Sequence, residues 1–471
     1  YAMGSSMAKS DAVQHAPAFT LRLLERLGIA TQKITNHREP NAAQRVRTVL
    51  LEDQHGLLLV LLGGDLLLDL RNLHRLTGRA LQALRPERLQ RMLDKQQLDC
   101  LPGLPALTSA VCLYDRRLLQ QTSLLIESGQ SGVLLELGRE AFTRLLGQAQ
   151  AADLGVSLAN IPLNLKHPDL DLGQISQAVQ KSTRHNAQQP LAATLAIPPL
   201  SKVAQRLLIL RVDPDSTVDD ITRVVESDPQ LTTLLLQWAA TPGFAVPGKV
   251  RSVEDALVRV LGFDLGSHMA LGLAVGRILP TAHTLSPRVA SRSAARVTAA
   301  IAALIAVIPR AQRPERGLGC LCGLLHNIGF AALAHAFAQR FPLLHKQIAV
   351  NPQLHHAYIE QQLFGITRAQ LGSWLLRNWD MPEEVSIAVR FQNDPDYAGP
   401  HALYANLLCL ALHLLAAQGI GAGPLDRVTP ALFERLGLER QTAEAALAAT
   451  FQAVAASGQT TRQLPSSMLT V

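Results

Sequence analysis

GLLHNIG, residues 323–329, is the stretch that says most about the fold and chemistry of this chain. An apolar helix is expected to end at the His326-Asn327 pair, with Gly329 two residues later. Histidine is a common ligand of divalent cations, but the amide of Asn327 lacks the charge that offsets desolvation of such an ion. The stretch therefore raises the question of whether this half of the chain catalyses any reaction.

The sequence on both sides of this stretch has the periodicity of helices. Residues 197–203 (IPPLSKV) predict an extended lead into a helix that Ser201 caps. Residues 227–230 (SDPQ) predict the start of the next helix, and residues 252–262 (SVEDALVRVLG) predict another. We therefore expect an all-α C-terminal half, with one domain over 190–400, further helices over 401–456 and a flexible tail over 457–471.

These segments, with Leu371-Gly372 and Trp379 downstream, resemble the HDOD (HD-related output domain) family. The resemblance implies kinship with HD-superfamily enzymes, whose His-Asp doublet binds a metal for phosphate-ester hydrolysis. The equivalent ligand positions here are residues 291–296 without a histidine, His326-Asn327, the vicinity of Thr367, and Phe391-Gln392. Because only one histidine remains, the resemblance predicts neither a bound metal nor phosphohydrolase activity.

A polar hollow between helices is expected where that metal site would lie. Its predicted lining is His326, Asn327, Glu360, Thr367 and Gln392. A nucleotide, another small ligand or a protein partner could bind there, or the side chains could form an internally hydrogen-bonded cluster. Surface or helix-cap positions are predicted for four other histidines: His345, His355, His356 and His401.

The N-terminal half has a different pattern, that of an α+β domain over residues 18–148. Residues 18–36 predict an amphipathic helix ended by Gly28, followed by a hairpin of two apolar strands, 47–51 and 56–62. Three more strands (109–114, 124–129 and 132–137) and a helix over 139–146 complete a mixed sheet with helices. Residues 149–189 are polar and contain several prolines, which predicts a connector.

The order of these pieces resembles the YbaK/prolyl-tRNA-synthetase-associated family, which deacylates mischarged tRNA. The matching features form a candidate deacylase pocket: Arg47, Thr48, Gly63, Gly64, Pro102, Gly103 and Asp115. Editing members usually carry a lysine where Arg47 stands, and arginine presents different geometry. Cys100 and Leu101 add bulk where a glycine-rich turn would let an ester approach. The resemblance thus implies a ligand-binding pocket with weak or no deacylase activity.

Composition and charge restrict the remaining possibilities. The 471 residues carry a formal charge of +7, which suits an anionic partner or an ordinary arginine-rich surface. One concentration of basic residues could bind tRNA or be a solvated face: Arg71, His74, Arg75, Arg79, Arg85, Arg88 and Arg91. Five cysteines in mostly apolar runs predict free thiols in a reducing cytoplasm. No signal peptide or bilayer-length apolar run is expected, and residues 1–17 are expected to be a tag remnant and a flexible N-terminus.

Two functions follow from these patterns. The first is a cytoplasmic bacterial regulatory protein, in which a catalytically degenerate HDOD domain docks or senses and a YbaK-like domain binds a ligand or tRNA. The second is a trans-acting aminoacyl-tRNA deacylase with a helical accessory domain. Neither function implies a cofactor, and both leave the oligomeric state open.

Overall fold

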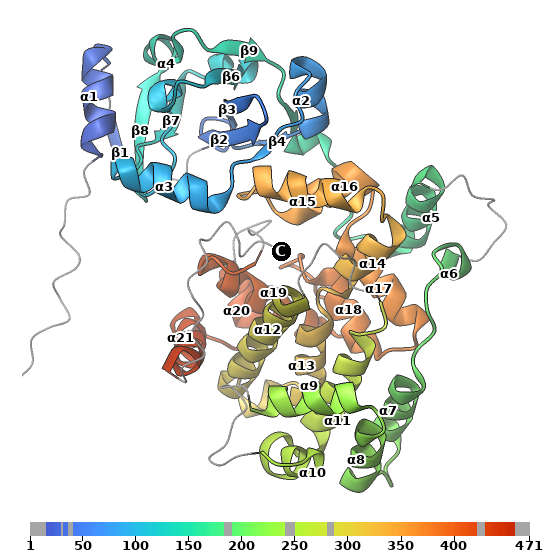
Figure 1. The fold of residues 1–471 in the computed structure, drawn as a ribbon. Coiled ribbons are helices and arrows are strands. Elements are labelled where there is room, and N and C mark those ends of the chain that lie inside the picture. Colours follow the sequence, from blue (N-terminus) through green and yellow to red (C-terminus); the bar gives the residue numbers. More distant parts are fainter. Residues whose placement is uncertain are drawn as a thin grey trace, which may run out of the picture. The chain divides into compact units, whose positions relative to one another are not determined.

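The computed structural model describes residues 16–29, 32–35, 41–182, 191–240, 250–279, 287–421 and 429–456. Contacts divide the chain into two compact units. The first comprises residues 1–162 together with 346–351, and the second comprises 163–345 and 352–471. The predicted class, a mixed sheet with helices followed by a mostly helical region, is confirmed (Figure 1).

The first unit is built around the predicted hairpin. Strands β2 (Val46–Asp53) and β3 (Gly56–Gly63) pair antiparallel through a turn at Gln54 and His55. They form the centre of a five-stranded sheet in the order β5-β2-β3-β6-β9. A three-stranded sheet (β1-β8-β7) and a two-stranded sheet (β10-β4) accompany it. The remaining strands are β1 (Gln32–Thr35), β4 (Leu66–Leu68), β5 (Gln82–Ala83), β6 (Val111–Asp115), β7 (Ser123–Glu127), β8 (Val133–Gly138), β9 (Gln150–Ala152) and β10 (Gly155–Ser157).

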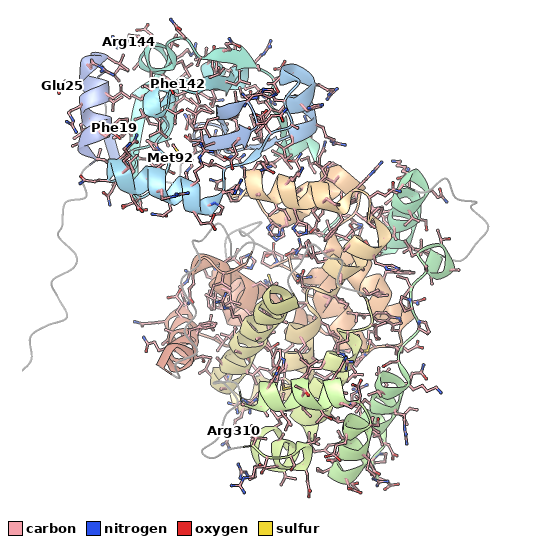
Figure 2. The ribbon with its side chains drawn as sticks, viewed as in Figure 1. Phe19, Glu25, Met92, Phe142, Arg144 and Arg310 are labelled. Atoms are coloured by element: carbon pink, nitrogen blue, oxygen red, sulfur yellow. The ribbon has the colours of Figure 1, made fainter. Side chains whose placement is uncertain are left out.

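Both faces of the central hairpin are buried, so its strands are continuous apolar runs rather than alternating ones. One face packs with Leu23 and Phe142 in a cluster that also contacts Phe19 and Met92 (Figure 2). These residues come from helices α1 (Ala18–Arg26), α3 (Pro86–Gln96) and α4 (Arg139–Leu146). The other face packs with Leu70 and Leu73 of α2 (Leu70–Thr77) and with Val350.

Two boundaries in this unit differ from the sequence expectations. The predicted helix ends at Arg26, two residues before Gly28, and residues 32–35, which lie within the range 18–36 assigned to the helix, form the strand β1. Residues 150–157, assigned to the connector, form β9 beside β6 and β10 beside β4. The prediction from composition was wrong for these residues, because short strands gain their hydrogen bonds from partners distant in sequence.

The second unit consists mainly of helices, and α15 (Phe341–Val350) is shared, because its residues 346–350 belong to the first unit. The other helices are α5 (Asp171–Ser182), α6 (Leu191–Thr194), α7 (Lys202–Val212), α8 (Val218–Glu226), α9 (Pro229–Ala239), α10 (Val253–Asp255), α11 (Gly262–Val275), α12 (Pro287–Val307), α13 (Arg316–Leu325), α14 (Ile328–Ala336), α16 (His356–Phe364), α17 (Arg368–Asn378), α18 (Glu383–Phe391), α19 (Ala402–Ala417), α20 (Pro430–Arg435) and α21 (Arg440–Ala456). The predicted caps are present: Ser201 caps α7, Asp228 caps α9 and Ser252 caps α10. Helix α13 packs against α11, α12 and α18, and α14 packs against α17.

Residues 163–182 of the predicted connector form hydrogen bonds and an ion pair with the helices of the second unit. Asp171, at the start of α5, forms a buried ion pair with Arg390 of α18 and accepts a hydrogen bond from Gln370 of α17 (2.9 Å). The guanidinium of Arg390 also donates to the carbonyl of Asn164 (2.9 Å). Residues 163–182 are therefore an ordered part of the second unit.

Two helical stretches are long and apolar enough to cross a bilayer, Val253–Val275 and Arg316–Ala336. The expectation that no apolar stretch approaches that length is wrong. Within an apolar 18-residue window of each stretch, 61% of the first and 83% of the second is buried, as in the core helices of folded domains.

Candidate functional site

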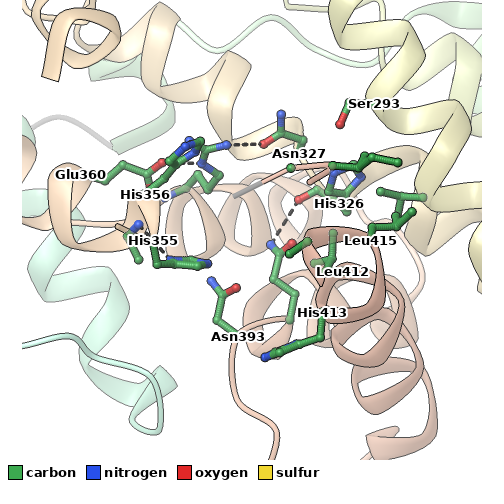
Figure 3. A pocket seen from close by; sticks show the side chains of 17 residues that line it. Ser293, His326, Asn327, His355, His356, Glu360, Asn393, Leu412, His413 and Leu415 are labelled. Atoms are coloured by element: carbon green, nitrogen blue, oxygen red, sulfur yellow. Dashed lines mark hydrogen bonds and ion pairs between the residues drawn. The ribbon is translucent and has the colours of Figure 1, made fainter. Parts of the chain in front are cut away.

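A polar cavity in the second unit lies where the HD-type ligand positions were expected (Figure 3). Its volume is about 80 Å³, and one water molecule needs roughly 10–15 Å³, so it holds several waters or a small polar group. Helices α12, α16 and α19 contribute side chains to its wall. The residues just after α13 and α18, the residue before α14 and the first residue of α17 also line it.

Gly329 brings two of these helices together. A Cβ atom on Gly329 would lie 1.8 Å from the carbonyl oxygen of Arg368, so the backbones of α14 and α17 touch at this point. Gly372 makes the reciprocal approach from α17. The glycine in the GLLHNIG stretch thereby places Asn327, just before α14, beside Arg368, the first residue of α17.

The guanidinium of Arg368 lies among the polar groups of the cavity. It donates hydrogen bonds to Oδ1 of Asn327 (2.9 Å) and to Nδ1 of His356 (3.1 Å), and it forms an ion pair with Glu360. Glu360 also accepts from the backbone N–H of Arg368 (2.8 Å). The Arg368 side chain is 14% exposed and that of Glu360 is 1% exposed. The centre of this polar cluster is therefore a protein cation with its own counter-ion.

Three histidines of the cavity, His326, His355 and His356, are neutral near pH 7. Burial lowers the pKa of His326 to about 4 and that of His355 to about 3, and it lowers the pKa of His356 well below the ordinary range. Nearby Arg368 lowers all three pKa values further. Nδ1 of His326 lies 2.7 Å from the carbonyl of Gly323, which only accepts, so this nitrogen carries the proton. Nε2 of His326 is then an acceptor.

Four of the five predicted lining residues meet at the cavity: His326, Asn327, Glu360 and Gln392. Gln392 donates to the carbonyl of His326 (3.1 Å). Thr367 instead caps α17 and shares a reciprocal capping box with Gln370. Arg368, the residue after Thr367, was not predicted to line the cavity, because the equivalent ligand position was assigned to the vicinity of Thr367.

Other lining residues were also missed, notably His355, His356, Asn393, His413 and Ser293. His355 caps α16 by accepting from the N–H of Ala357 (3.1 Å), and a helix cap was one of its two predicted positions. His356 is 2% exposed and is not at the surface. Its spacing of four residues from Glu360 would have placed both on one helix face, a signal that the sequence did contain.

The candidate deacylase residues lie in the first unit and are divided between the two faces of its central sheet. Arg47 lies two residues from Val49, and Asp115 two residues from Leu113, so both lie on the sheet face that packs on Leu73. Arg117 forms an ion pair with Asp115 there (2.7 Å). Thr48 alternates to the opposite face, where Gly103 packs on Ile126. The N–H of Gly64 donates to the carbonyl of Arg45 (2.8 Å), and Gly63 precedes it as the last residue of β3. Pro102 directly precedes Gly103.

Arg47 is buried without a carboxylate in hydrogen-bond contact. Its exposed fraction is 5%, and Nε and Nη1 have no partner among the described residues. Nη2 donates to the side-chain oxygen of Asn351 (3.0 Å). Desolvation lowers the pKa of Arg47 to about 10, which nearby Asp65 partly offsets, so the group is charged at neutral pH.

Most of the predicted basic face is paired within the first unit. Arg79 binds Asp53 (2.5 Å), and Arg88 binds Glu52 (2.6 Å). Arg85 lies 3.8 Å from Glu52, and Arg71 lies 3.5 Å from Asp69. The positive charge available to a nucleic acid is therefore smaller than the sequence suggested. The predicted free thiols are present, since all five cysteines are unpaired.

Comparison with known proteins agrees with this two-part architecture. The HDOD domain model matches residues 197–395, and the aminoacyl-tRNA editing domain model matches residues 30–145. A crystal structure from Marinobacter aquaeolei VT8, described as a "putative signal transduction protein", is 34% identical. The match covers 94% of this chain and 99% of that one, with a TM-score of 0.84.

This chain therefore belongs to the same family as the Marinobacter protein, with an N-terminal aminoacyl-tRNA editing (YbaK-like) domain and a C-terminal HDOD domain. A more distant relative is an "uncharacterized protein" of Treponema pallidum (strain Nichols), 22% identical over 213 residues. That match covers 44% of this chain and 40% of the relative, so the chain spans less than half of the relative's length.

Proposed function

We propose that this protein is a signal-transduction or regulatory protein whose HDOD domain binds rather than hydrolyses. In this proposal, the HDOD domain docks or senses, and the editing domain binds a ligand or tRNA. The observation that carries the proposal is the position of Arg368 among Asn327, His356 and Glu360.

The contacts of Arg368 do not fit a divalent cation. A metal needs the lone pairs of Asn327 Oδ1 and His356 Nδ1, and both accept hydrogen bonds from the guanidinium. The carboxylate of Glu360 already compensates one positive charge. A second cation would meet repulsion from Arg368 and compete with it for every ligand, and a neutral amide would add no charge.

The remaining space suits a small polar ligand or a partner's side chain. The wall offers neutral imidazoles and the amides of Gln392 and Asn393, which donate and accept hydrogen bonds without net charge. A cavity of about 80 Å³ accommodates few atoms. This chemistry favours recognition by hydrogen bonding over recognition by charge.

Titration of Mn²⁺ into the full chain tests this proposal, together with hydrolysis of bis(p-nitrophenyl) phosphate. We expect neither saturable binding nor turnover. A double variant, Asn327→Asp with Arg368→His, removes the guanidinium and supplies two ligands, so we expect it to gain Mn²⁺ affinity. Arg377→His, at an exposed position of the same helix, is the matched control. Saturable Mn²⁺ binding with turnover by the unaltered chain would refute the proposal.

A second function, hydrolysis of mischarged aminoacyl-tRNA, is favoured by one observation. The editing-domain match covers residues 30–145 and includes the buried cation Arg47, two of whose donor nitrogens have no described partner. Such donors stabilise a carbonyl or anionic oxygen. A deacylation assay against a panel of mischarged tRNAs, with Arg47→Ala as the control, tests this alternative. Turnover that falls with the substitution would establish a deacylase, and no turnover across the panel would leave a binding module.

A further inference from the structure

Residues 346–351 belong by their contacts to the first unit, although residues 163–345 separate them from its other part. They are the second half of α15 and the residue that follows it. Four of them, Gln347, Ile348, Val350 and Asn351, are buried, whereas Lys346 and Ala349 are exposed. One side of this helical segment is therefore packed against the sheet face that carries Arg47.

The side chain of Asn351 uses both ends of its amide on that face. Its oxygen accepts from Nη2 of Arg47 (3.0 Å) and from the backbone N–H of Leu68 (2.9 Å). Its nitrogen donates to the carbonyl of Leu68 (3.1 Å). Asn351 is completely buried. One carboxamide thus satisfies a cation, a backbone donor and a backbone acceptor at once.

Two neighbours hold the segment in place. In the amide orientation that satisfies both ends, Gln347 donates to the carbonyl of Leu68 (2.8 Å) and accepts from the N–H of Leu70 (3.0 Å). Val350 is completely buried in the apolar cluster of this sheet face. The segment therefore binds the backbone at residues 68–70 much as a ligand would.

The side chain of Asn351 satisfies only part of the hydrogen-bonding capacity of Arg47. A buried charge is costly unless it is paired, and a neutral amide offers Arg47 a single acceptor. Its Nε and Nη1 have no described partner. A carboxylate at the same place would supply two acceptor oxygens and a compensating charge, which matches the planar fork of a guanidinium better.

We propose that Arg47 and the Leu68 backbone form a binding site for a small amino-acid-like ligand, and that Asn351 occupies this site as an intramolecular ligand. An α-amino acid offers a carboxylate to Arg47 and the Leu68 N–H, and an ammonium to the Leu68 carbonyl. Binding requires residues 346–351 to withdraw. This inference rests on the proposed role of the first unit as a binding module.

A short stretch of backbone connects Asn351 to the HDOD cavity, so a change in the cavity could control whether Asn351 occupies the Arg47 site. Asn351 precedes by only a few residues His355 and His356, which line the HDOD cavity. A ligand or partner that changes the cavity wall at these histidines would act on the segment through this short stretch of backbone. Coupling of this kind requires a measured shift in occupancy, since adjacency in the chain alone does not establish it.

Calorimetric titration of the full chain with L-aspartate and L-asparagine tests the inference. Asn351→Ala empties the site, and Lys346→Ala, on the exposed side of the same segment, is the matched control. We expect Asn351→Ala to bind L-aspartate at least tenfold more tightly than the control, and to lose this binding when Arg47→Met is added. Equal affinity of Asn351→Ala and Lys346→Ala would show that Asn351 is only a packing residue and would overturn the inference.

Hydrogen exchange of the unaltered chain provides a second measurement if Asn351→Ala fails to fold. We expect a high concentration of L-aspartate to increase exchange of the backbone amides of residues 346–351. Unchanged protection would overturn the inference. Neither measurement involves Mn²⁺ or phosphate-ester hydrolysis, so failure here is distinguishable from failure of the proposed HDOD role.

Discussion

Arg368 is the residue on which the interpretation of the HDOD cavity depends. Its guanidinium links α14, α16 and α17 through Asn327, His356 and Glu360, and it lies over the ring of Phe330 at 4.3 Å. Because Glu360 is buried, the pair contributes to stability only while both members are present. The same side chain that excludes a metal therefore also holds the cavity wall together.

Replacing Arg368 with alanine is expected to lower the free energy of unfolding of the second unit by about 3–5 kcal/mol, because it leaves Glu360 buried and unpaired. Urea denaturation followed by tryptophan fluorescence measures this change. All three tryptophans (Trp238, Trp374 and Trp379) lie in the second unit. Arg377→Ala is the control on the same helix, and an effect no larger than that of the control would contradict the expected role.

The buried histidines predict a dependence of stability on pH. The folded protein lowers the pKa of His326 from 6.5 to about 4, so below pH 6.5 the unfolded chain binds the proton more readily than the folded one. The contribution of the neutral His326 to the free energy of unfolding is therefore fully present above pH 6.5 and is lost as the pH falls towards 4. The loss from this group is at most about 3 kcal/mol. His326→Asn should flatten the loss measured by urea denaturation, whereas His167→Asn, at an exposed position, should not. Parallel pH profiles for the two variants would contradict the assignment.

At the scale of elements, the contact between α14 and α17 positions the cavity. Gly329 and Gly372 allow the two backbones to touch, and the caps at Asn327 and Thr367 lie beside this contact. In the first unit, the corresponding feature is the β2–β3 hairpin. Its two buried faces separate Arg47 from Thr48, so neighbouring residues belong to different environments.

Gly329→Ala should destabilise the second unit by about 1–3 kcal/mol, because its methyl group would overlap the carbonyl of Arg368 and force the helices apart. Gly173→Ala is the matched control. Gly173 lies in α5 with open space around its Cβ position, and alanine should stabilise that helix by roughly 0.5–1 kcal/mol. Tryptophan fluorescence in urea measures both variants, and a shift of equal sign would contradict the close contact.

At the scale of the whole molecule, an editing domain and an HDOD domain are joined in one chain, and a short segment of the C-terminal half takes part in the first unit. That arrangement gives the protein two candidate sites, the HDOD cavity and the Arg47 site. The proposals assign each a different ligand chemistry. Neutral hydrogen-bonding groups suit the first, and a carboxylate suits the second.

The affinity of the full chain for tRNA should depend only weakly on salt. Within the predicted basic face, four arginines lie next to carboxylates, which leaves the arginines Arg75 and Arg91. Two phosphate contacts give a slope of about −2 in a plot of log affinity against log salt. Fluorescence anisotropy with labelled tRNA measures the slope. A slope near −6 would mean that the whole face contacts phosphates and would favour the deacylase alternative.

The sequence by itself determined the two-domain architecture, because hydrophobic periodicity, helix caps and turn residues are local signals. It also determined that His326 lacks an acidic neighbour, since Asn327 can be read directly. Only the tertiary structure brought Arg368 to Asn327, His356 and Glu360, and only it placed Asn351 on Arg47. These contacts join residues from about 8 to 304 positions apart. Their partners are selected by packing and burial in three dimensions, for which the local sequence pattern carries no signal.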